Sequence, residues 1–185
     1  MSDNLAYREE LIAGEIVMMA PASVNHTFIS GNIYGIFWSY LKGKRCTPIS
    51  DGTTVYLSDD DHFVPDFMVV CDTDKIKPDG VHGAPDLVAE VLSPSTAKND
   101  KGYKMEAYAK FGVKEYWIAN PADKSVDVYI LKGSSFILHD VHAIRPEWEL
   151  NKISEGERAS LVTKFKCSLF NDLEISLEDI FYRTF

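Results

Sequence analysis

The chain of 185 residues has little cysteine and no surplus of basic side chains. Its three cysteines, Cys46, Cys71 and Cys167, are widely spaced, odd in number and without a CxxC pair. This pattern favours buried thiols in a reducing compartment. With 19 Lys and Arg against 28 Asp and Glu, the net charge is −9. That balance argues against a protein that coats DNA through a broad basic face, but it permits a local site where metal ions neutralise carboxylates and a phosphate.

Long apolar runs are also missing. No segment approaches the roughly 20 apolar residues that cross a bilayer, and the first four residues do not begin a signal peptide. We therefore expect a cytoplasmic protein with no membrane partner. The remaining composition, 45% hydrophobic and 25% charged, is that of a soluble globular protein. A chain of this length most economically forms one domain, spanning residues 1–185.

The most informative stretch is the apolar run at residues 87–92, bounded by Pro85 and Pro94. Such a run is typical of a central strand that is buried on both faces. Glu90 lies in the middle of it. A buried carboxylate without a partner is costly, so it pairs with a cation, binds a metal or takes up a proton. The rest of the chain must therefore supply a partner for Glu90.

Hydrophobic periodicity and turn signals predict the other elements. In chain order they are a hairpin at 11–19 turning at Ala13-Gly14, a helix at 26–41 capped by Ser23 or Asn25, strands within 46–57, a strand at 63–71, a helix from Thr96 or Asn99 to Phe111, a hairpin of 115–120 with 125–131, a third strand at 136–139 and a capped helical turn at 176–181. The charged turn at 58–61 lacks the ligand pattern of a calcium loop, so we interpret it as solvated.

Two neighbouring strands of this arrangement each carry an interior acid, Asp66 and Glu90, and Lys104 lies near the start of the next helix. Adjacent strands are about 4.8 Å apart, so level side chains on one face can share a cation. Mg²⁺ is typically held by one or two carboxylates together with waters and substrate phosphates. The simpler alternative is a metal-free pair of Glu90 with Lys104. Two acids facing one lysine favour the metal site.

Three strings in this region carry a resemblance: VPD at 64–66, PDLVAEVLSPST at 85–96 and FGVKEYWI at 111–118. They resemble the Uma-type family of putative restriction endonucleases, within the PD-(D/E)XK nuclease superfamily. The resemblance extends from residues 11–15 to residues 173–177 and is most specific in the middle. It implies an α/β fold with a restriction-endonuclease-like core. In that core a mixed central β-sheet is flanked by helices, with N-terminal and C-terminal β-hairpin additions.

The same resemblance implies Mg²⁺-dependent hydrolysis of phosphodiester bonds in DNA, with Mn²⁺ as a substitute metal. Asp66 matches the metal-binding aspartate and Glu90 the acid of the (D/E)XK element, and the backbone carbonyl of Val91 would be a further ligand. Leu92 stands where the superfamily has its lysine. Lys104, one turn inside the following helix, is the candidate to replace that lysine. The superfamily's habit of pairing active sites across a duplex also leads us to expect a homodimer.

The surrounding residues have more than one interpretation. His26 either contacts phosphate or carries a proton, or it is a helix-end residue, and Glu15 is a candidate to complete the metal shell. We interpret Asp86 as a turn or cap residue, Asp100 as an acid favoured by the helix dipole and Lys101 as solvated.

Two other functions of the protein stay open. One is a catalytically silent protein of this fold that binds nucleic acid or a partner protein, and the other is a phosphodiesterase acting on RNA or a small nucleotide.

Overall fold

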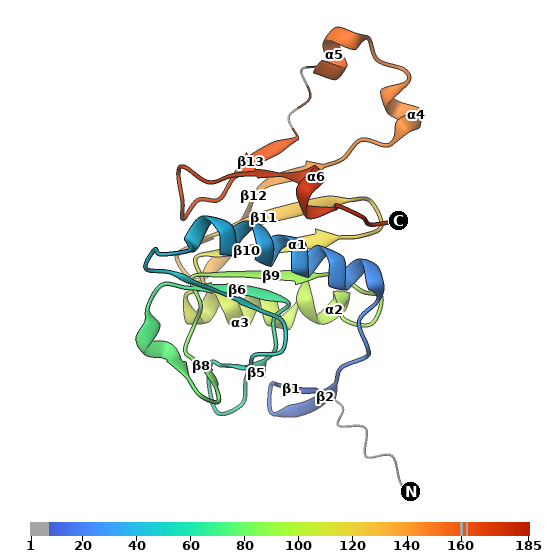
Figure 1. Ribbon diagram of the computed structural model, residues 1–185. Helices are drawn as coiled ribbons and strands as arrows, with labels where there is room; N and C mark the ends of the chain where they lie inside the picture. The colour runs from blue at the N-terminus through green and yellow to red at the C-terminus, as the bar shows by residue number, and fades with distance from the viewer. Residues whose placement is uncertain (1–7, 160, 162) are drawn as a thin grey trace, which may run out of the picture.

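A mixed sheet of six strands forms the centre of the computed structural model, which describes residues 8–159, 161 and 163–185 (Figure 1). In sheet order the strands are β12 (Ser135–Ala143), β11 (Ser125–Lys132), β10 (Glu115–Asn120), β9 (Leu87–Val91), β6 (Phe67–Val70) and β3 (Thr47–Ser50). Strand β9 runs parallel to β10 and antiparallel to β6. The predicted mixed sheet with a buried central strand is confirmed, as is the meander of β10, β11 and β12.

The five residues of β9 are all buried, and alternate side chains enter different clusters. Leu87, Ala89 and Val91 belong to one hydrophobic cluster, and Val88 belongs to the other. Because side chains alternate along a strand, Glu90 points to the same side as Val88. The carboxylate is thus directed to one defined face of the sheet.

Helices cover both faces of this sheet (Figure 1). Helix α1 (Val24–Leu41) packs on the face of Leu87 and Ala89, through Ile29, Ile33 and Phe37. Its N-cap is Ser23, whose Oγ accepts the His26 N–H at 3.2 Å. The opposite face holds α3 (Tyr103–Phe111), whose Ala107 and Tyr108 share a cluster with Val88.

The structure divides the second predicted helix in two, because α2 (Ala97–Asp100) ends before α3 begins. Gly102 lies at the break. A Cβ at that position would meet the carbonyl oxygen of Lys98 at 2.7 Å, closer than any side chain tolerates, so the close approach requires glycine. The break turns the end of α2 toward the start of α3, which places Asp100 near Lys104.

A second sheet lies beside the α3 face, with the strand order β2-β1-β5-β4-β8-β7. Its strands are β1 (Glu9–Ile12), β2 (Glu15–Met18), β4 (Val55–Tyr56), β5 (His62–Phe63), β7 (Ile76–Lys77) and β8 (Gly80–His82), and η1 (Thr73–Lys75) precedes β7. The predicted N-terminal hairpin is confirmed as β1 and β2. Ala13 and Gly14 turn between them with φ of 53° and 78°, as a type I′ turn requires. The predicted strand at 63–71 is divided into β5 and β6 at Pro65, which has no N–H for a sheet ladder.

The C-terminal part contains the short helices α4 (Glu147–Leu150) and α5 (Glu155–Ala159), a hairpin of β13 (Lys164–Lys166) with β14 (Glu174–Ser176), and α6 (Leu177–Ile180). The hairpin confirms the predicted C-terminal addition. Figure 1 shows α4 and α5 projecting beyond the sheet.

Glu115 of β10 is fully buried and accepts the Ser168 N–H at 2.9 Å and the Trp117 indole N–H at 2.6 Å. These contacts join the segment after β13 to the main sheet.

The prediction of three buried thiols is wrong for two of the cysteines. Cys46 and Cys71 form a disulfide, with an S–S distance of 1.98 Å, and Cys167 is the buried free thiol. The pairing follows from the antiparallel register, since Thr47 of β3 lies opposite Val70 of β6, and one further step brings Cys46 opposite Cys71. Their sequence separation of 25 residues gave no sign of this pairing.

Among the helices of the described residues, none combines the length and hydropathy to span a membrane.

Candidate active site

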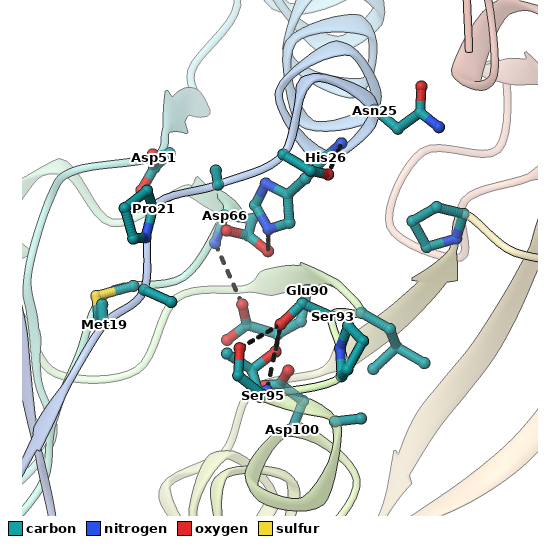
Figure 2. A pocket seen from close by; sticks show the side chains of 18 of the residues that line it. Met19, Pro21, Asn25, His26, Asp51, Asp66, Glu90, Ser93, Ser95 and Asp100 are labelled. Atoms are coloured by element: carbon teal, nitrogen blue, oxygen red, sulfur yellow. Dashed lines mark hydrogen bonds and ion pairs between the residues drawn. The ribbon is translucent and has the colours of Figure 1, made fainter. Parts of the chain in front are cut away.

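Four carboxylates and one lysine gather at the end of β9 that carries Glu90. We call Glu10, Asp66, Glu90 and Asp100 the acid cluster, and all four are at most 7% exposed, as is Lys104 at 3%. They come from β1, the residue before β6, β9 and the end of α2. Figure 2 shows Asp66, Glu90 and Asp100 gathered around one cleft. Elements far apart in the sequence thus contribute acids to one place.

Lys104 contacts three members of the cluster. Its ammonium nitrogen lies 2.8 Å from Glu90 Oε1, 3.0 Å from Glu10 Oε1 and 3.3 Å from Asp100 Oδ1. Burial alone would lower the pKa of Lys104, but the charge of Glu90, followed by smaller contributions from Tyr108, Glu10 and Asp100, places it well above its ordinary value. Lys104 therefore remains a charged ammonium inside the protein.

Asp66 and Glu90 are held next to each other by the sheet. In the β6–β9 pairing Phe67 lies opposite Ala89, so one further step sets Asp66 opposite Glu90. The Asp66 N–H donates to Glu90 Oε2 at 3.3 Å, and the Val91 N–H donates to Asp66 Oδ2 at 2.7 Å. Backbone groups thus fix both carboxylates before any ligand binds.

The charges of this site do not balance. Burial raises the pKa of Glu90 well above its ordinary value; Lys104 opposes that rise, while Asp100, Asp66 and Glu10 add to it. Burial likewise raises the pKa of Asp100, with Lys104 again opposing. The Lys104 ammonium, even with a protonated His26 beside Asp66, does not compensate four carboxylates in a low-dielectric interior. The cluster therefore favours an additional proton or an additional cation.

His26 faces Asp66 from the first turn of α1 (Figure 2). Its Nε2 lies 3.0 Å from Asp66 Oδ2. Burial lowers the pKa of His26, but the hydrogen bond and the charge of Asp66 outweigh it, so the net pKa is raised. Because Ser23 provides the helix cap, the imidazole of His26 is available to hold a proton beside the carboxylate.

The cleft above these groups has a volume of about 1000 Å³. Its lining includes the acid cluster and Lys104, together with Leu92, two residues after Glu90. Its walls are largely apolar and include Met19, Pro21, Pro94, Pro121 and Phe185. Figure 2 shows Met19 and Pro21 on one side and Ser93 and Ser95 near Glu90. The buried charges thus open onto a cleft large enough for a small-molecule-sized group.

Sequence reasoning anticipated part of this site. The structure brings together Asp66, Glu90, Lys104 and His26, and Val91 follows Glu90 with its N–H bound to Asp66. It does not bring Glu15 there: Glu15 lies in β2 across the turn from Ile12, is exposed and does not line the cleft.

Two site residues were missed by the sequence analysis. Glu10 alternates with Ile12 on the buried side of β1, and its Oε1 also accepts the Val64 N–H at 2.8 Å. The alternation was a signal that could have separated Glu10 from Glu15. Asp100 lies four residues before Lys104 and contacts it, a helical spacing that the sequence displays.

The oxygen donors of Asp66 and Glu90 could form part of a divalent-metal site. Within the described part of the chain, no group of three or more His, Cys, Asp or Glu side chains is arranged to hold a metal ion. Mg²⁺ in enzymes needs only one or two carboxylates, completed by waters and substrate phosphate. Asp66 and Glu90 provide such oxygens within a region of excess negative charge. The residues fit a hard cation that substrate and water help to hold.

Comparisons with known proteins agree with this picture. The Uma2 family, described as "Putative restriction endonuclease", matches residues 1–160. The uncharacterized protein slr1290 of Synechocystis sp. (strain ATCC 27184 / PCC 6803 / Kazusa) is 30% identical over 124 residues, which are 66% of this chain and 65% of that protein. The uncharacterized protein sll1609 of the same organism is 29% identical over 104 residues, covering 55% and 59%. The chain thus spans less than two thirds of the length of these curated relatives.

A solved structure is similar over nearly the whole chain. It is described as a putative nuclease belonging to DUF820 from Anabaena variabilis ATCC 29413. The match has a TM-score of 0.68 and 20% sequence identity, and it covers 95% of this chain and 90% of the other. At that identity the likeness shows a shared fold.

Proposed function

This chain belongs to the Uma2 family, and on that premise we propose that it is a metal-dependent endonuclease that hydrolyses phosphodiester bonds of DNA. One observation carries the proposal: the Lys104 ammonium lies 2.8 Å from Glu90, whose neighbour across the sheet is Asp66. Two acids and a lysine are the side chains that the resemblance requires. Here they converge at the floor of a cleft although the lysine comes from α3 and not from β9.

In this proposal Asp66 and Glu90 would hold Mg²⁺, the backbone carbonyl of Val91 would be a further ligand, and Mn²⁺ would serve as a substitute metal. Such an ion, when bound, polarises the phosphate and lowers the pKa of a coordinated water. The excess negative charge of the acid cluster supports its binding. Glu15 has no part in this set because it lies outside the cleft.

Lys104 orients the attacking water or stabilises the charge that develops on the phosphorus oxygens. Its placement supports this role, because three carboxylates fix the ammonium on the α3 face of the sheet. Leu92 occupies the position where the superfamily has its lysine, and it carries no charge. In this proposal the Lys104 ammonium, from the neighbouring helix α3, takes the place of that lysine. His26 holds a proton at Nε2 beside Asp66 and serves as a phosphate contact or proton carrier.

A plasmid assay tests the proposal. Purified protein should nick or linearise plasmid DNA with Mg²⁺ or Mn²⁺, and chelation should stop the reaction. The Glu90→Gln variant, prepared in the same way, controls for contaminating nucleases. Equal cleavage by parent and variant would refute the assignment. Parallel reactions with RNA and with a small phosphodiester determine the substrate class.

One observation favours the catalytically silent alternative. Lys104 is already shared among three carboxylates, so part of the cluster is compensated without a metal. Isothermal titration with Mn²⁺ separates the two functions. A nuclease site binds the metal in the parent and loses it in Glu90→Gln, whereas a plain interaction module binds none.

The proposed partners are DNA and a second copy of the chain. The exposed apolar side chains Ile137, Leu138 and Val141 on the edge strand β12, each about half exposed, support a homodimer. Light scattering at micromolar concentration tests the homodimer, and a monomer would refute it.

A cytoplasmic location also remains a prediction, tested by fractionation of cells that express the protein.

A further inference from the structure

One aromatic residue that lines the cleft, Phe185, has no part in the proposed chemistry. Phe185 lines the cleft together with the acid cluster, and 86% of its surface is exposed. Nucleobases stack on such rings in proteins that bind single strands.

The backbone of Phe185 is fixed although its ring is exposed. The side-chain amide of Asn25 bonds to it on both sides: Nδ2 donates to the Phe185 carbonyl, and Oδ1 accepts the Phe185 N–H at 3.2 Å. The preceding Thr184 carbonyl accepts from Lys124 Nζ at 3.3 Å. Asn25 directly precedes His26, which contacts Asp66. The first turn of α1 thus positions both the backbone of Phe185 and, through His26, one wall of the acid site.

The walls of the cleft suit a nucleobase better than they suit the phosphate backbone of a duplex. Among the lining residues of the described chain, the Lys and Arg side chains are Arg8 and Lys104, and both are engaged in ion pairs. The Arg8 Nη1 lies 2.7 Å from both carboxylate oxygens of Asp51. A duplex is held chiefly through many phosphate contacts with basic side chains. This cleft offers few, and the chain has a net charge of −9.

Resting on the nuclease function proposed above, we propose that the cleft accepts an unpaired nucleotide. Its base stacks on Phe185 and packs against the apolar wall, and its phosphate lies toward Asp66 and Glu90. The volume of about 1000 Å³ falls within the range of sites for small ligands. The substrate class is therefore single-stranded or locally unpaired DNA, not a continuous duplex.

Fluorescence anisotropy tests this preference without requiring cleavage. The probes are a labelled oligothymidylate and a labelled hairpin duplex of the same nucleotide length, both with Ca²⁺ as a hard cation for carboxylate and phosphate oxygens. We expect the single strand to bind at least about tenfold more tightly than the duplex, and Phe185→Ala to weaken its binding roughly 5- to 100-fold. Phe185→Tyr keeps an aromatic face and should retain most of the affinity.

Tyr182→Ala is the matched control. Tyr182 is 58% exposed and belongs to the same segment, but it does not line the cleft, so its removal should leave both affinities unchanged. Equal binding of duplex and single strand, no binding of the single strand, or no effect of Phe185→Ala would each overturn the inference. Failure to cleave with Mg²⁺ or Mn²⁺ while the binding preference persists would instead refute the nuclease function alone.

Discussion

The two ends of strand β9 carry the same kind of side chain in opposite electrostatic settings. At the entrance, Asp86 accepts the Cys71 N–H at 2.7 Å and pairs with Lys114 at 2.7 Å. Burial of Asp86 acts to raise its pKa, but the hydrogen bonds from Lys114 and Cys71 outweigh it, so the net pKa is lowered. At this end of β9 the charge of the Asp86 carboxylate is balanced by the Lys114 ammonium, and the Cys71 N–H provides a further hydrogen bond.

At the exit of the strand, Glu90 shares its cation with Glu10 and Asp100, and its pKa is raised chiefly by burial. A buried surplus of acid destabilises the empty protein. A perturbed pKa in a cleft is a marker of a functional site. The ratio of acids to cations, and not the presence of a buried acid, therefore distinguishes the cleft end of β9 from the end at Asp86.

The largest expected effect is that of Asp66→Asn. This change should reduce cleavage and Mn²⁺ affinity by more than about a hundredfold, because even residues outside the direct ligands cost 10- to 100-fold. Plasmid cleavage and isothermal titration measure the two effects. Asp86→Asn at the other end of β9 is the control, and it should leave both unchanged. A variant at Asp86 that lost as much as the variant at Asp66 would break the comparison.

Lys104→Met should come next. Cleavage should fall about 10²- to 10³-fold, as when one charge-stabilising donor is lost, with metal affinity nearly unchanged because an ammonium is not a metal ligand. Removing the cation from a buried ion cluster should also cost roughly 3–5 kcal/mol of unfolding free energy in the metal-free protein, and less with metal bound. Kinetics and urea unfolding with and without Mn²⁺ report these effects.

Lys101→Met is the matched control for this change. Lys101 is exposed, with its ammonium 3.9 Å from Asp127, and it does not line the cleft. Its loss should alter cleavage little. If Lys104→Met cleaves DNA as fast as the parent, Lys104 does not replace the lysine missing at position 92.

The sequence predicted the sheet and most of the site because the informative signals were local. An apolar run interrupted by Glu90, and an apolar strand containing Asp66, each show a buried acid without knowledge of the fold. Lys104 followed from the absence of a lysine at Leu92 and the helix that comes next. These inferences needed only strand order and spacing, which periodicity and the family resemblance provide.

The remaining site residues had local signals that became decisive only with the tertiary contacts. Alternation with Ile12 marks Glu10 as a buried residue of β1, but the packing of β1 beside β5 is what brings it to Lys104. Asp100 is the last residue of α2, and the chain continues through Gly102 into α3, where Lys104 contacts it. The Cys46–Cys71 disulfide likewise required the register of β3 with β6.

A moderate effect is expected from metal on thermal stability. A ligand that binds only the folded state stabilises by about 2.7 kcal/mol at a hundredfold excess over Kd, or roughly 5–10 °C in Tm for a chain of this size. Millimolar Mg²⁺ or Mn²⁺ should produce such a rise in the parent and in Asp86→Asn, but not in Asp66→Asn. A Tm that neither ion moves in the parent would contradict the metal site.

The smallest effect, and the most direct test of the comparison, is the pH dependence of unfolding in the metal-free protein. The pKa of Glu90 is raised above its ordinary 4.5, so between that value and the folded value the native state binds more protons than the unfolded state. The contribution of Glu90 to the free energy of unfolding is therefore present at low pH and lost as the pH rises. Asp86, with a pKa lowered from 3.8, acts oppositely, contributing above that value and losing its contribution as the pH falls.

Urea unfolding at a series of pH values from about 3 to 8 resolves the two contributions. Glu90→Gln should remove part of the decline toward neutral pH, since a glutamine does not titrate. Asp86→Asn should remove part of the decline below about pH 4, by at most about 1 kcal/mol because Lys114 is 61% exposed. The two variants should therefore flatten opposite limbs of the curve. If both flattened the acidic limb, Glu90 would be an ordinary ion-paired acid like Asp86, and the surplus charge assigned to its end of β9 would be disproved.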